Sequence, residues 1–328
     1  MKITSQIASQ YVALTRGCGV ADVSDRTWIA VMGGDRVRFL HAFCTNDVKA
    51  LSPGAGCEAF VTNHQGKTIG HVNLLCQPDR ILVDGSPGQA AALIAHWDRF
   101  VISEDVQFQD CAAVSAALLL SGPETTNIWR QISAGESLPL GLLEHRTVPL
   151  AGKPTLVCRL GWTGPDSYLL RVDRQDLGAV KNAIFTAGAT ACDSQAVDLA
   201  RIEAGSLVFG QDVRDDYLPQ EINRGAQAIS FKKGCYLGQE TVARIDALGH
   251  VNWQTAGVQW VDASAPVPAV GAELKVDDKV VGHVTSVAYS IRLGAPLAIA
   301  RLKRLLATIG TRFSTQLGDM QVVSLPLA

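Results

Sequence analysis

The feature of the sequence that most constrains the fold is an order of predicted elements that occurs twice. Residues 67–85 predict two short strands around a Gln-Pro-Asp turn, and residues 86–102 predict a helix. Residues 155–172 predict a second hairpin, and residues 174–188 predict a second helix. The two units lie about ninety residues apart. This order predicts an α+β fold with two similar halves, although identity between them is too low for a sequence repeat.

Capping residues mark where two helices are predicted to begin. Ser86 suits an N-cap and Pro87 suits the first helical position, which places the start of one helix at residue 87. Asp35 suits the N-cap of an earlier amphipathic helix. Asn46 and Asp47 follow at or just past the end of that helix, where both residue types commonly form a cap and a turn.

The pattern of the chain changes after Gly249. Short strand-like runs separated by Gly, Pro and Asp replace the helical periodicity, which predicts a small all-β domain, a barrel or half-barrel. A chain of 328 residues also exceeds one simple core. We therefore expect an N-terminal α+β domain over 1–150 that includes parts of 190–248, a second α+β domain over 151–249, and a β-barrel over 250–328.

The composition excludes several classes of function. Apolar residues make up 47% of the chain and the formal net charge is −2, so no global basic field attracts nucleic acid. The longest apolar run, residues 111–120, is about half of what a membrane-spanning helix needs. The N-terminal residues lack the apolar core and cleavage site of a signal peptide. We expect a cytoplasmic protein with no direct nucleic-acid or membrane partner.

The cysteines are scattered along the chain. No pair forms a C-x-x-C motif and none lies near a histidine at zinc-finger spacing, so we expect no metal site built from this chain alone. Scattered cysteines of such a chain are usually small buried apolar residues. That role is expected for seven of the eight: Cys18, Cys44, Cys57, Cys76, Cys111, Cys158 and Cys192.

Cys235 is the exception, because it lies in the segment "KKGCYLGQE". Residues 228–231 have strand character and residues 240–249 are helical in pattern, so the segment is predicted to join a strand to a helix N-terminus. A helix N-terminus and the adjacent Lys232 and Lys233 would lower the pKa of a thiol there. The plainer alternative is a small packed residue in a glycine-bounded turn with solvated lysines.

Several stretches of the chain resemble one protein family. "KKGCYLGQETVARI" closely resembles the K-G-C-Y-x-G-Q-E signature of the YgfZ-type folate-binding proteins, relatives of the glycine-cleavage T-protein, an aminomethyltransferase. Further similar segments are "VRFLHAFCTNDVKAL", "RLGWTGPDSYLL", "DLARIEAGSLVFGQDV", "LPQE" and "VGHVTSVAYSIRLGAPLAIARLKR". The resemblance covers nearly the whole chain. It implies a T-protein-like ring of α+β domains and a C-terminal β-barrel around a central channel.

The resemblance also implies a ligand, partners and a set of site residues. Tetrahydrofolate or a one-carbon derivative would occupy the channel, and the N-terminal domain would be its folate-binding domain. The protein would support assembly or repair of iron–sulfur clusters, including those of tRNA-modifying enzymes, with iron–sulfur proteins or assembly factors as partners. The implied reactive residues are Cys235 and Lys233, and the implied folate-binding residues are Asn46, Asp47, Trp162, Arg201, Glu221, Gly234, Tyr236 and Gln239.

Ordinary structural roles compete with these assignments. Arg201 and Glu203 would form a surface ion pair of little energetic value. Glu221 would be a solvated loop carboxylate, and Trp162 would pack in the core rather than stack on a flat ring.

The sequence departs from the T-protein at the positions that carry its chemistry. Gly70 and His71 stand where the T-protein's catalytic aspartate segment aligns. Pro165 and Leu169 stand in place of glutamates, and Val197 in place of an arginine. These departures argue against plain aminomethyl transfer. A folate-dependent aminomethyl- or methyltransferase and a non-catalytic folate-binding scaffold remain as alternatives.

Overall fold

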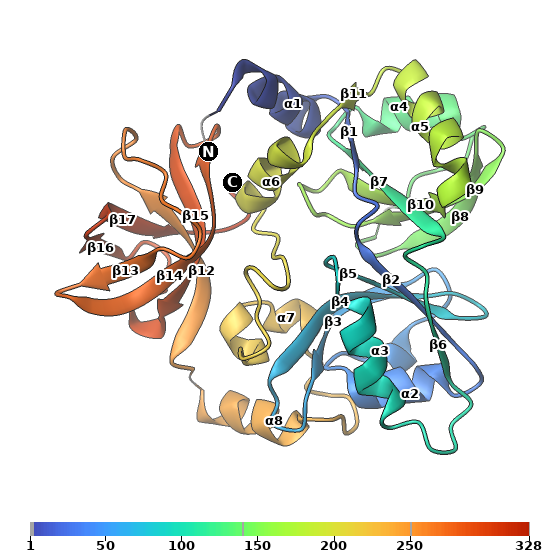
Figure 1. Cartoon of the computed structure of the whole chain (residues 1–328), viewed down its shortest axis with the longest axis horizontal. Coiled ribbons are helices and arrows are strands. Elements are labelled where there is room, and N and C mark those ends of the chain that lie inside the picture. The colour runs from blue at the N-terminus through green and yellow to red at the C-terminus, as the bar shows by residue number, and fades with distance from the viewer. Residues whose placement is uncertain (1–2, 140, 250, 328) are drawn as a thin grey trace.

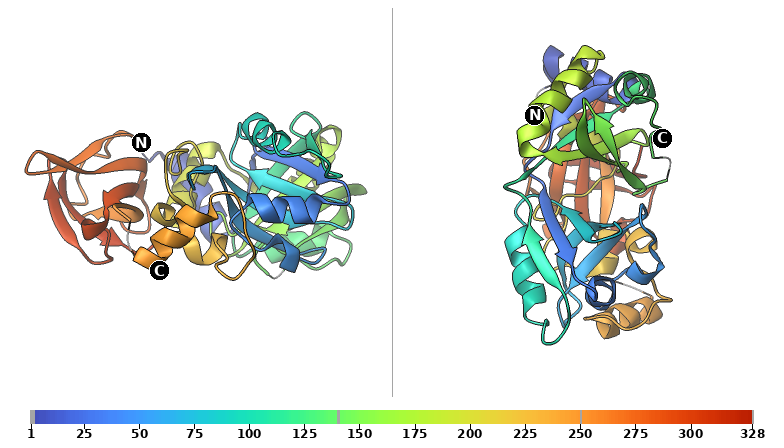
Figure 2. Two further views of the ribbon diagram at one scale, coloured as in Figure 1. Left: turned by 90° about the horizontal axis from the view of Figure 1, so that it is seen from below. Right: turned by 90° about the vertical axis from the view of Figure 1, so that its right-hand side faces the viewer.

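The computed structural model describes residues 3–139, 141–249 and 251–327, so His250 at the predicted domain boundary lies outside the described residues. Three β-sheets form three lobes that surround a common centre (Figure 1). The barrel lies at one end of the molecule and the two α+β lobes at the other (Figure 2). The predicted α+β ring with a C-terminal barrel is therefore confirmed.

The first sheet belongs to the N-terminal half. Its strands are β2 (Thr27–Met32), β3 (Gly56–Thr62), β4 (Thr68–Cys76), β5 (Ile81–Gly85) and β6 (Gln107–Asp110), in the spatial order β3-β4-β5-β2-β6. All neighbours in it are antiparallel. Helices α2 (Arg36–Phe43) and α3 (Ala90–Asp98) cover its outer face, and the 3₁₀ turn η1 (Val48–Ala50) follows α2.

The second sheet follows the same path of strand, helix, three strands and helix. Its strands are β1 (Gly19–Asp22), β7 (Ser115–Ser121), β8 (His145–Leu150), β9 (Lys153–Arg159), β10 (Ser167–Asp173) and β11 (Thr190–Ala191), in the order β11-β1-β7-β10-β9-β8. Helices α4 (Thr125–Ile132) and α5 (Leu177–Thr186) cover its outer face, with the 3₁₀ turn η2 (Arg174–Asp176) before α5. The prediction of two similar halves is thus confirmed.

Strand alternation assigns each side chain to one of two cores. In β7, Leu118 and Leu120 pack beneath α4 and α5, while Leu119 faces the other sheet. In β2, Ile29 and Val31 likewise pack against α2 and α3. Because neighbouring strand residues point to opposite faces, both faces of each sheet are covered and the apolar runs are continuous. By strand pairing alone, residues 115–150 belong with the second sheet, so the division near residue 150 stays a proposal.

The C-terminal lobe is a nearly closed barrel. Its strands are β12 (Trp253–Trp260), β13 (Glu273–Val276), β14 (Lys279–Ser290), β15 (Ala295–Lys303), β16 (Arg312–Thr315) and β17 (Gly318–Val323), in the order β13-β14-β15-β12-β17-β16, with the 3₁₀ turn η4 (Arg304–Leu306) after β15. Gln316, in the turn between β16 and β17, bonds the backbone of Glu273 and Lys275 in β13. The two edge strands are thereby brought together, which leaves little free edge.

Four further helices connect the lobes: α1 (Ser5–Arg16), α6 (Ser194–Glu203), α7 (Gly225–Ala228) and α8 (Gln239–Leu248), with the 3₁₀ turn η3 (Pro219–Ile222) before α7. Glu203, at the end of α6, accepts hydrogen bonds from the Tyr11 hydroxyl of α1 and from Ser290 of the barrel (Oγ–Oε1 2.6 Å). The backbone N–H of Leu327 donates to the Glu203 carbonyl. Both ends of the described chain therefore meet α6.

Two local predictions were wrong. Helix α3 begins at Ala90 rather than at residue 87, because Ser86 accepts a hydrogen bond from the Phe209 N–H and is held in the strand-to-helix turn. Residues 228–231 form no strand, since Ala228 ends the short helix α7 and Ser230 bonds Thr45 across the chain. No helix within the described residues is long and apolar enough to cross a membrane.

Candidate functional site

The central pocket lies between the two α+β halves and the segment 206–208. Its cavity volume is about 110 Å³, below the roughly 300–1,000 Å³ common for ligand pockets, and it is open to solvent. Its polar or aromatic lining comes from both halves and the connecting segments: Arg26, Glu58, His71, Asn73, Ser86, Trp162, Ser206 and Arg224. It is the natural candidate for a ligand site.

A buried carboxylate, Glu58, organises one wall of this pocket. Arg224 forms a bidentate pair with it, with Nε–Oε1 at 2.9 Å, and the His71 Nε2 lies 2.7 Å from Oε1. Burial alone would raise the pKa of Glu58, but the hydrogen bonds from His71 and Arg224 outweigh it and lower the pKa to about 2. Glu58 is therefore ionised and engaged by its neighbours near neutral pH.

A second arginine–carboxylate pair lies on the same face of the first sheet, where Asn73 is paired with Glu58 on one side and with Asp84 on the other. The Arg26 Nε and Nη2 each donate to Asp84 at 2.7 Å, and the Asn73 amide donates to the same carboxylate at 2.9 Å. The Arg26 guanidinium also lies 4.8 Å from the ring centroid of Trp162. Both carboxylates beside the pocket are thus neutralised by an arginine, which leaves the Trp162 ring, the Asn73 carbonyl and the arginine edges to contact a ligand.

Three of the positions that depart from the T-protein pattern, His71, Leu169 and Val197, lie in two different environments. His71 lines the pocket, where it contacts Glu58. Leu169 and Val197 are buried in the core between the sheets, where Leu169 pairs with Leu119 and Cys158 across β10. Neither apolar residue offers a charge or a hydrogen bond to a ligand.

Asn46 and Asp47 shape the chain after α2. The Asn46 amide donates to the carbonyls of Glu58 (2.7 Å) and Gln227 (2.8 Å). The Asp47 carboxylate caps η1 by accepting from the Ala50 N–H at 3.2 Å. Asn46 therefore joins the N-terminal sheet to the segment that precedes Cys235. Neither residue lines the central pocket in the described structure.

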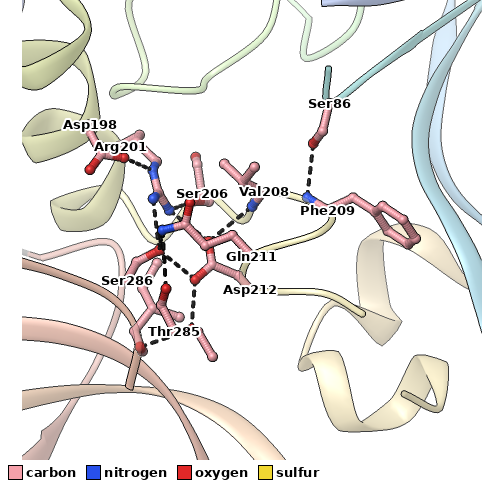
Figure 3. Close-up of polar contacts among 11 residues, drawn as sticks. Ser86, Asp198, Arg201, Ser206, Val208, Phe209, Gln211, Asp212, Thr285 and Ser286 are labelled. Carbon is pink, nitrogen blue, oxygen red and sulfur yellow. Dashed lines mark hydrogen bonds and ion pairs between the residues drawn. The ribbon is translucent and has the colours of Figure 1, made fainter. Parts of the chain in front are cut away.

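Arg201 lies at the junction of α6 and the barrel (Figure 3). Its guanidinium donates at 2.7 Å to each of Asp198, Asp212 and Ser286, and it is almost fully buried. The alternative of a surface ion pair with Glu203 is wrong, because both residues are buried and each bonds other partners. Arg201 is not among the described residues that line the pocket.

Glu221 makes a comparable contact with β15, the barrel strand that pairs with β14. Its Oε2 lies 2.9 Å from the Arg301 Nη2, and the Arg301 guanidinium lies 4.0 Å from the ring centroid of Tyr217. The carboxylate is buried, so the alternative of a solvated loop residue is wrong. This ion pair fixes η3 against β15.

The segment "KKGCYLGQE" is held by its backbone and by one buried lysine. Lys233 donates its Nζ hydrogens to the carbonyls of His41 and Cys44 at the end of α2, and its side chain is only 8% exposed. Gly238 has φ +83°, and a Cβ there would meet the Asn63 carbonyl oxygen at 2.5 Å, so only glycine fits. Cys235, between these anchors, is exposed.

The remaining residues of this segment have separate roles. Tyr236 is buried against the Lys233 ammonium, which lies 4.7 Å from its ring centroid. The Gln239 side chain accepts from the Tyr236 N–H at 3.3 Å, and Gly234 is exposed beside Cys235. Of the ten residues predicted for the site, only Trp162 is among the described residues that line the central pocket.

Replacement of Lys233 by methionine is expected to lower the free energy of unfolding by about 1–3 kcal/mol, because two buried carbonyls at the end of α2 lose their donor. The alternative of solvated lysines is wrong for Lys233, because this residue is buried. Urea denaturation measures the change. Lys232→Met, at the exposed neighbouring lysine, is the matched control and is expected to stay within about 0.5 kcal/mol of the parent. Equal stability of both variants would contradict the capping role.

Comparison with known proteins agrees with this architecture. The model of the GCVT N-terminal domain matches residues 2–233, and the model of the glycine cleavage T-protein C-terminal barrel domain matches residues 254–327. The chain belongs to the glycine cleavage T-protein family. Aminomethyltransferases of this family use tetrahydrofolate as substrate or cofactor.

Individual members of the family are similar over nearly the whole chain. An aminomethyltransferase of Nostoc sp. is 26% identical over 316 residues, which cover 93% of this chain and 82% of that protein. One of Geobacillus kaustophilus is 28% identical and covers 93% and 85%. The crystal structure of aminomethyltransferase T from Bartonella henselae superposes with a TM-score of 0.86 at 20% identity and covers 98% and 89%. This last likeness concerns the fold.

Sequence reasoning missed most of the polar residues of the pocket, among them Arg26, Glu58, Asn73 and Arg224. One signal was available, since Glu58 directly precedes the apolar run "AFV" in a strand whose other residues are mostly buried. A buried acid in a strand requires a partner. That partner, Arg224, lies 166 residues away in the sequence, so only the fold identifies it.

Proposed function

We propose that the protein binds tetrahydrofolate or a one-carbon derivative and supports the assembly or repair of iron–sulfur clusters in the cytoplasm, including those of tRNA-modifying enzymes. Its partners would be iron–sulfur proteins or assembly factors. The observation that carries the proposal is the exposed thiol of Cys235 on a rigidly anchored segment that resembles the YgfZ-type signature. Membership of the T-protein family supports the folate part.

The central pocket suits a flat heterocycle with an acidic tail. Trp162 offers an aromatic surface, and the Asn73 and His71 side chains offer polar atoms to a ring edge. Arg224 binds Glu58 through Nε and Nη2, and its Nη1 has no partner among the described residues, so it is available to a carboxylate. These residues would hold the folate, which when bound supplies one-carbon chemistry.

Cys235 would act on the outside of the ring rather than inside the pocket. Its thiolate would form a bond to iron, and the thiol proton would pass to solvent. One thiolate cannot hold a cluster, so the remaining ligands would come from the partner protein. The anchoring of Lys233 on α2 and the αL turn at Gly238 would keep the thiol presented. Lys233 would thus be a positioning residue.

Tetrahydrofolate at one hundred times its dissociation constant is expected to stabilise the protein by about 2.7 kcal/mol, since it binds only the folded state. Thermal unfolding and calorimetric titration measure this. Trp162→Leu is expected to weaken binding about tenfold, the value of one aromatic stacking contact. Trp253→Leu, at a half-buried tryptophan of the barrel, is the matched control. Absence of any signal at saturating tetrahydrofolate would end the folate proposal.

Aminomethyl transfer from a lipoyl carrier protein to tetrahydrofolate is expected to stay at background. The carboxylates beside the pocket are occupied by Arg26 and Arg224, and Leu169 and Val197 offer no charge. An aminomethyltransferase such as that of Geobacillus kaustophilus, assayed in parallel, is the positive control. Turnover comparable to that control would refute the expectation and favour the enzyme alternative.

That alternative is a folate-dependent aminomethyl- or methyltransferase, the activity for which the similar proteins are named, and these names do not favour it over the main proposal. A further alternative is a folate-binding scaffold in which Cys235 has no chemical task. The Cys235→Ser variant distinguishes the thiol role from the scaffold role. Loss of iron–sulfur enzyme activity in cells with retained folate binding supports the thiol role, whereas full activity supports the scaffold.

A further inference from the structure

A second concave surface lies beside the central pocket. We name it the basic groove, and it is lined by Asn63, His64, Ile69, Ala92, Ala95, His96, Arg99, Phe209, Gly210, Arg214 and Asp215. Residues 206–208 line the central pocket, and the next two residues line the groove. The Phe209 N–H donates to Ser86 Oγ at 2.9 Å, and Ser86 lines the central pocket (Figure 3). One stretch of chain thus separates the two sites.

The cationic side chains of the groove have no carboxylate partner. Arg99 and Arg214 form no ion pair with any described residue, and Asp215 is the one acidic side chain among the lining residues. The Arg99 Nη2 donates to the His96 Nδ1 at 2.7 Å. This acceptor is a neutral imidazole, so it does not balance the positive charge of Arg99. The lining therefore carries more positive than negative charge.

His96 adds a buried hydrogen-bond donor to this lining. Its side chain belongs to a residue only 5% exposed, and its Nε2 has no partner in the described structure. Because Nδ1 accepts from Arg99, the proton of the neutral ring lies on Nε2. Burial, with the nearby Arg99 charge, lowers the pKa of His96 to about 4, so the ring stays neutral at neutral pH. An unpaired buried donor is costly unless an acceptor reaches it.

We propose that the basic groove is a binding site for a multiply charged oxyanion, a chain of carboxylates or phosphates. Arg99 and Arg214 would bind it by charge-assisted hydrogen bonds, and His96 would hold the Arg99 guanidinium in place through its Nδ1. The anionic group comes from one of two sources. It belongs either to the acidic tail of a ligand held in the adjacent central pocket or to a separate polyanion.

The first test titrates the full-length protein with tripolyphosphate and with penta-γ-glutamate, without folate. Both are expected to bind, and the Arg99→Gln/Arg214→Gln double variant is expected to bind each about a hundredfold more weakly, about tenfold per charge-assisted hydrogen bond. Arg312→Gln, at an exposed arginine of the barrel, is the matched control and should bind as the parent does. No binding by the parent, or equal binding by the double variant, would overturn the proposal.

The second test identifies the source of the anion. If a folate tail occupies the groove, triglutamyl tetrahydrofolate should bind more tightly than the monoglutamate, and the double variant should lose only that gain. If a separate polyanion occupies it, tripolyphosphate should bind equally well with and without tetrahydrofolate, and the tail should give no gain. Binding of tripolyphosphate by a protein that binds no folate would sustain the groove while refuting the folate proposal.

Discussion

Replacement of Arg201 by methionine is expected to lower the free energy of unfolding by about 3–5 kcal/mol, the cost of leaving a buried charge unpaired. The Asp212 carboxylate is fully buried, and its Oδ2 lies 2.7 Å from the Arg201 Nη1. Asp212 also accepts from Thr285 and Ser286 of the barrel. Loss of the guanidinium therefore uncouples α6 from β14 while an uncompensated carboxylate remains inside. Urea denaturation followed by circular dichroism measures the change.

Two further variants make this test specific. Asp198→Asn removes the half-exposed partner of the same arginine and is expected to cost less than about 1 kcal/mol, as exposed ion pairs do. The double variant Arg201→Met/Asp212→Leu removes both buried charges and should recover much of the loss. If Arg201→Met is as stable as Asp198→Asn, the buried network does not hold the barrel.

Cys235 is expected to react with limiting iodoacetamide at least about a hundred times faster than any other cysteine, because buried thiols react only after an opening that costs several kcal/mol. The other cysteines are buried or partly buried. Burial raises the pKa of Cys18 and Cys44 to about 11 and that of Cys192 to about 12. At neutral pH these groups are almost entirely thiol, which is the unreactive form. Peptide mapping by mass spectrometry measures the rates.

The same experiment tests how the thiol is presented. The Lys233 ammonium donates to the His41 and Cys44 carbonyls, so Lys233 holds this segment against the end of α2. Lys233→Met should therefore expose Cys44 by loosening α2 more than it slows Cys235. Labelling of Cys235 no faster than of Cys192 would make it a packing residue.

The sequence predicted those elements whose pattern is local. The hairpins of both halves and the β-rich C-terminal region follow from strand alternation and turn residues. The predicted start of α3 was wrong because the Ser86 hydroxyl, which could cap a helix, instead accepts a hydrogen bond from the Phe209 N–H of a distant segment. Likewise "AISF" has strand propensity but no neighbouring strand to pair with, so tertiary context decides its conformation.

The polar site was less predictable, for a physical reason. Lysine and arginine are rarely buried, so Lys233 and Arg201 read as surface or ligand-binding residues until their partners are known. Those partners, the Cys44 carbonyl and Asp212 with Ser286, come from other segments. The Glu58–Arg224 pair likewise joins two regions that the chain order separates. Charge pairing across a fold is set by topology, which a single sequence does not display.

The meeting of both chain ends at Glu203 has a mechanical consequence. The Tyr11 hydroxyl, Ser290 and the Leu327 N–H all bond this one residue, so the barrel is fastened to the helix that also carries the N-terminal segment. We expect these contacts to restrict rotation of the barrel about α6. We therefore expect a ligand to reach the centre through local movement of short segments such as 206–210. The three lobes are expected to keep their relative positions while the ligand binds and leaves.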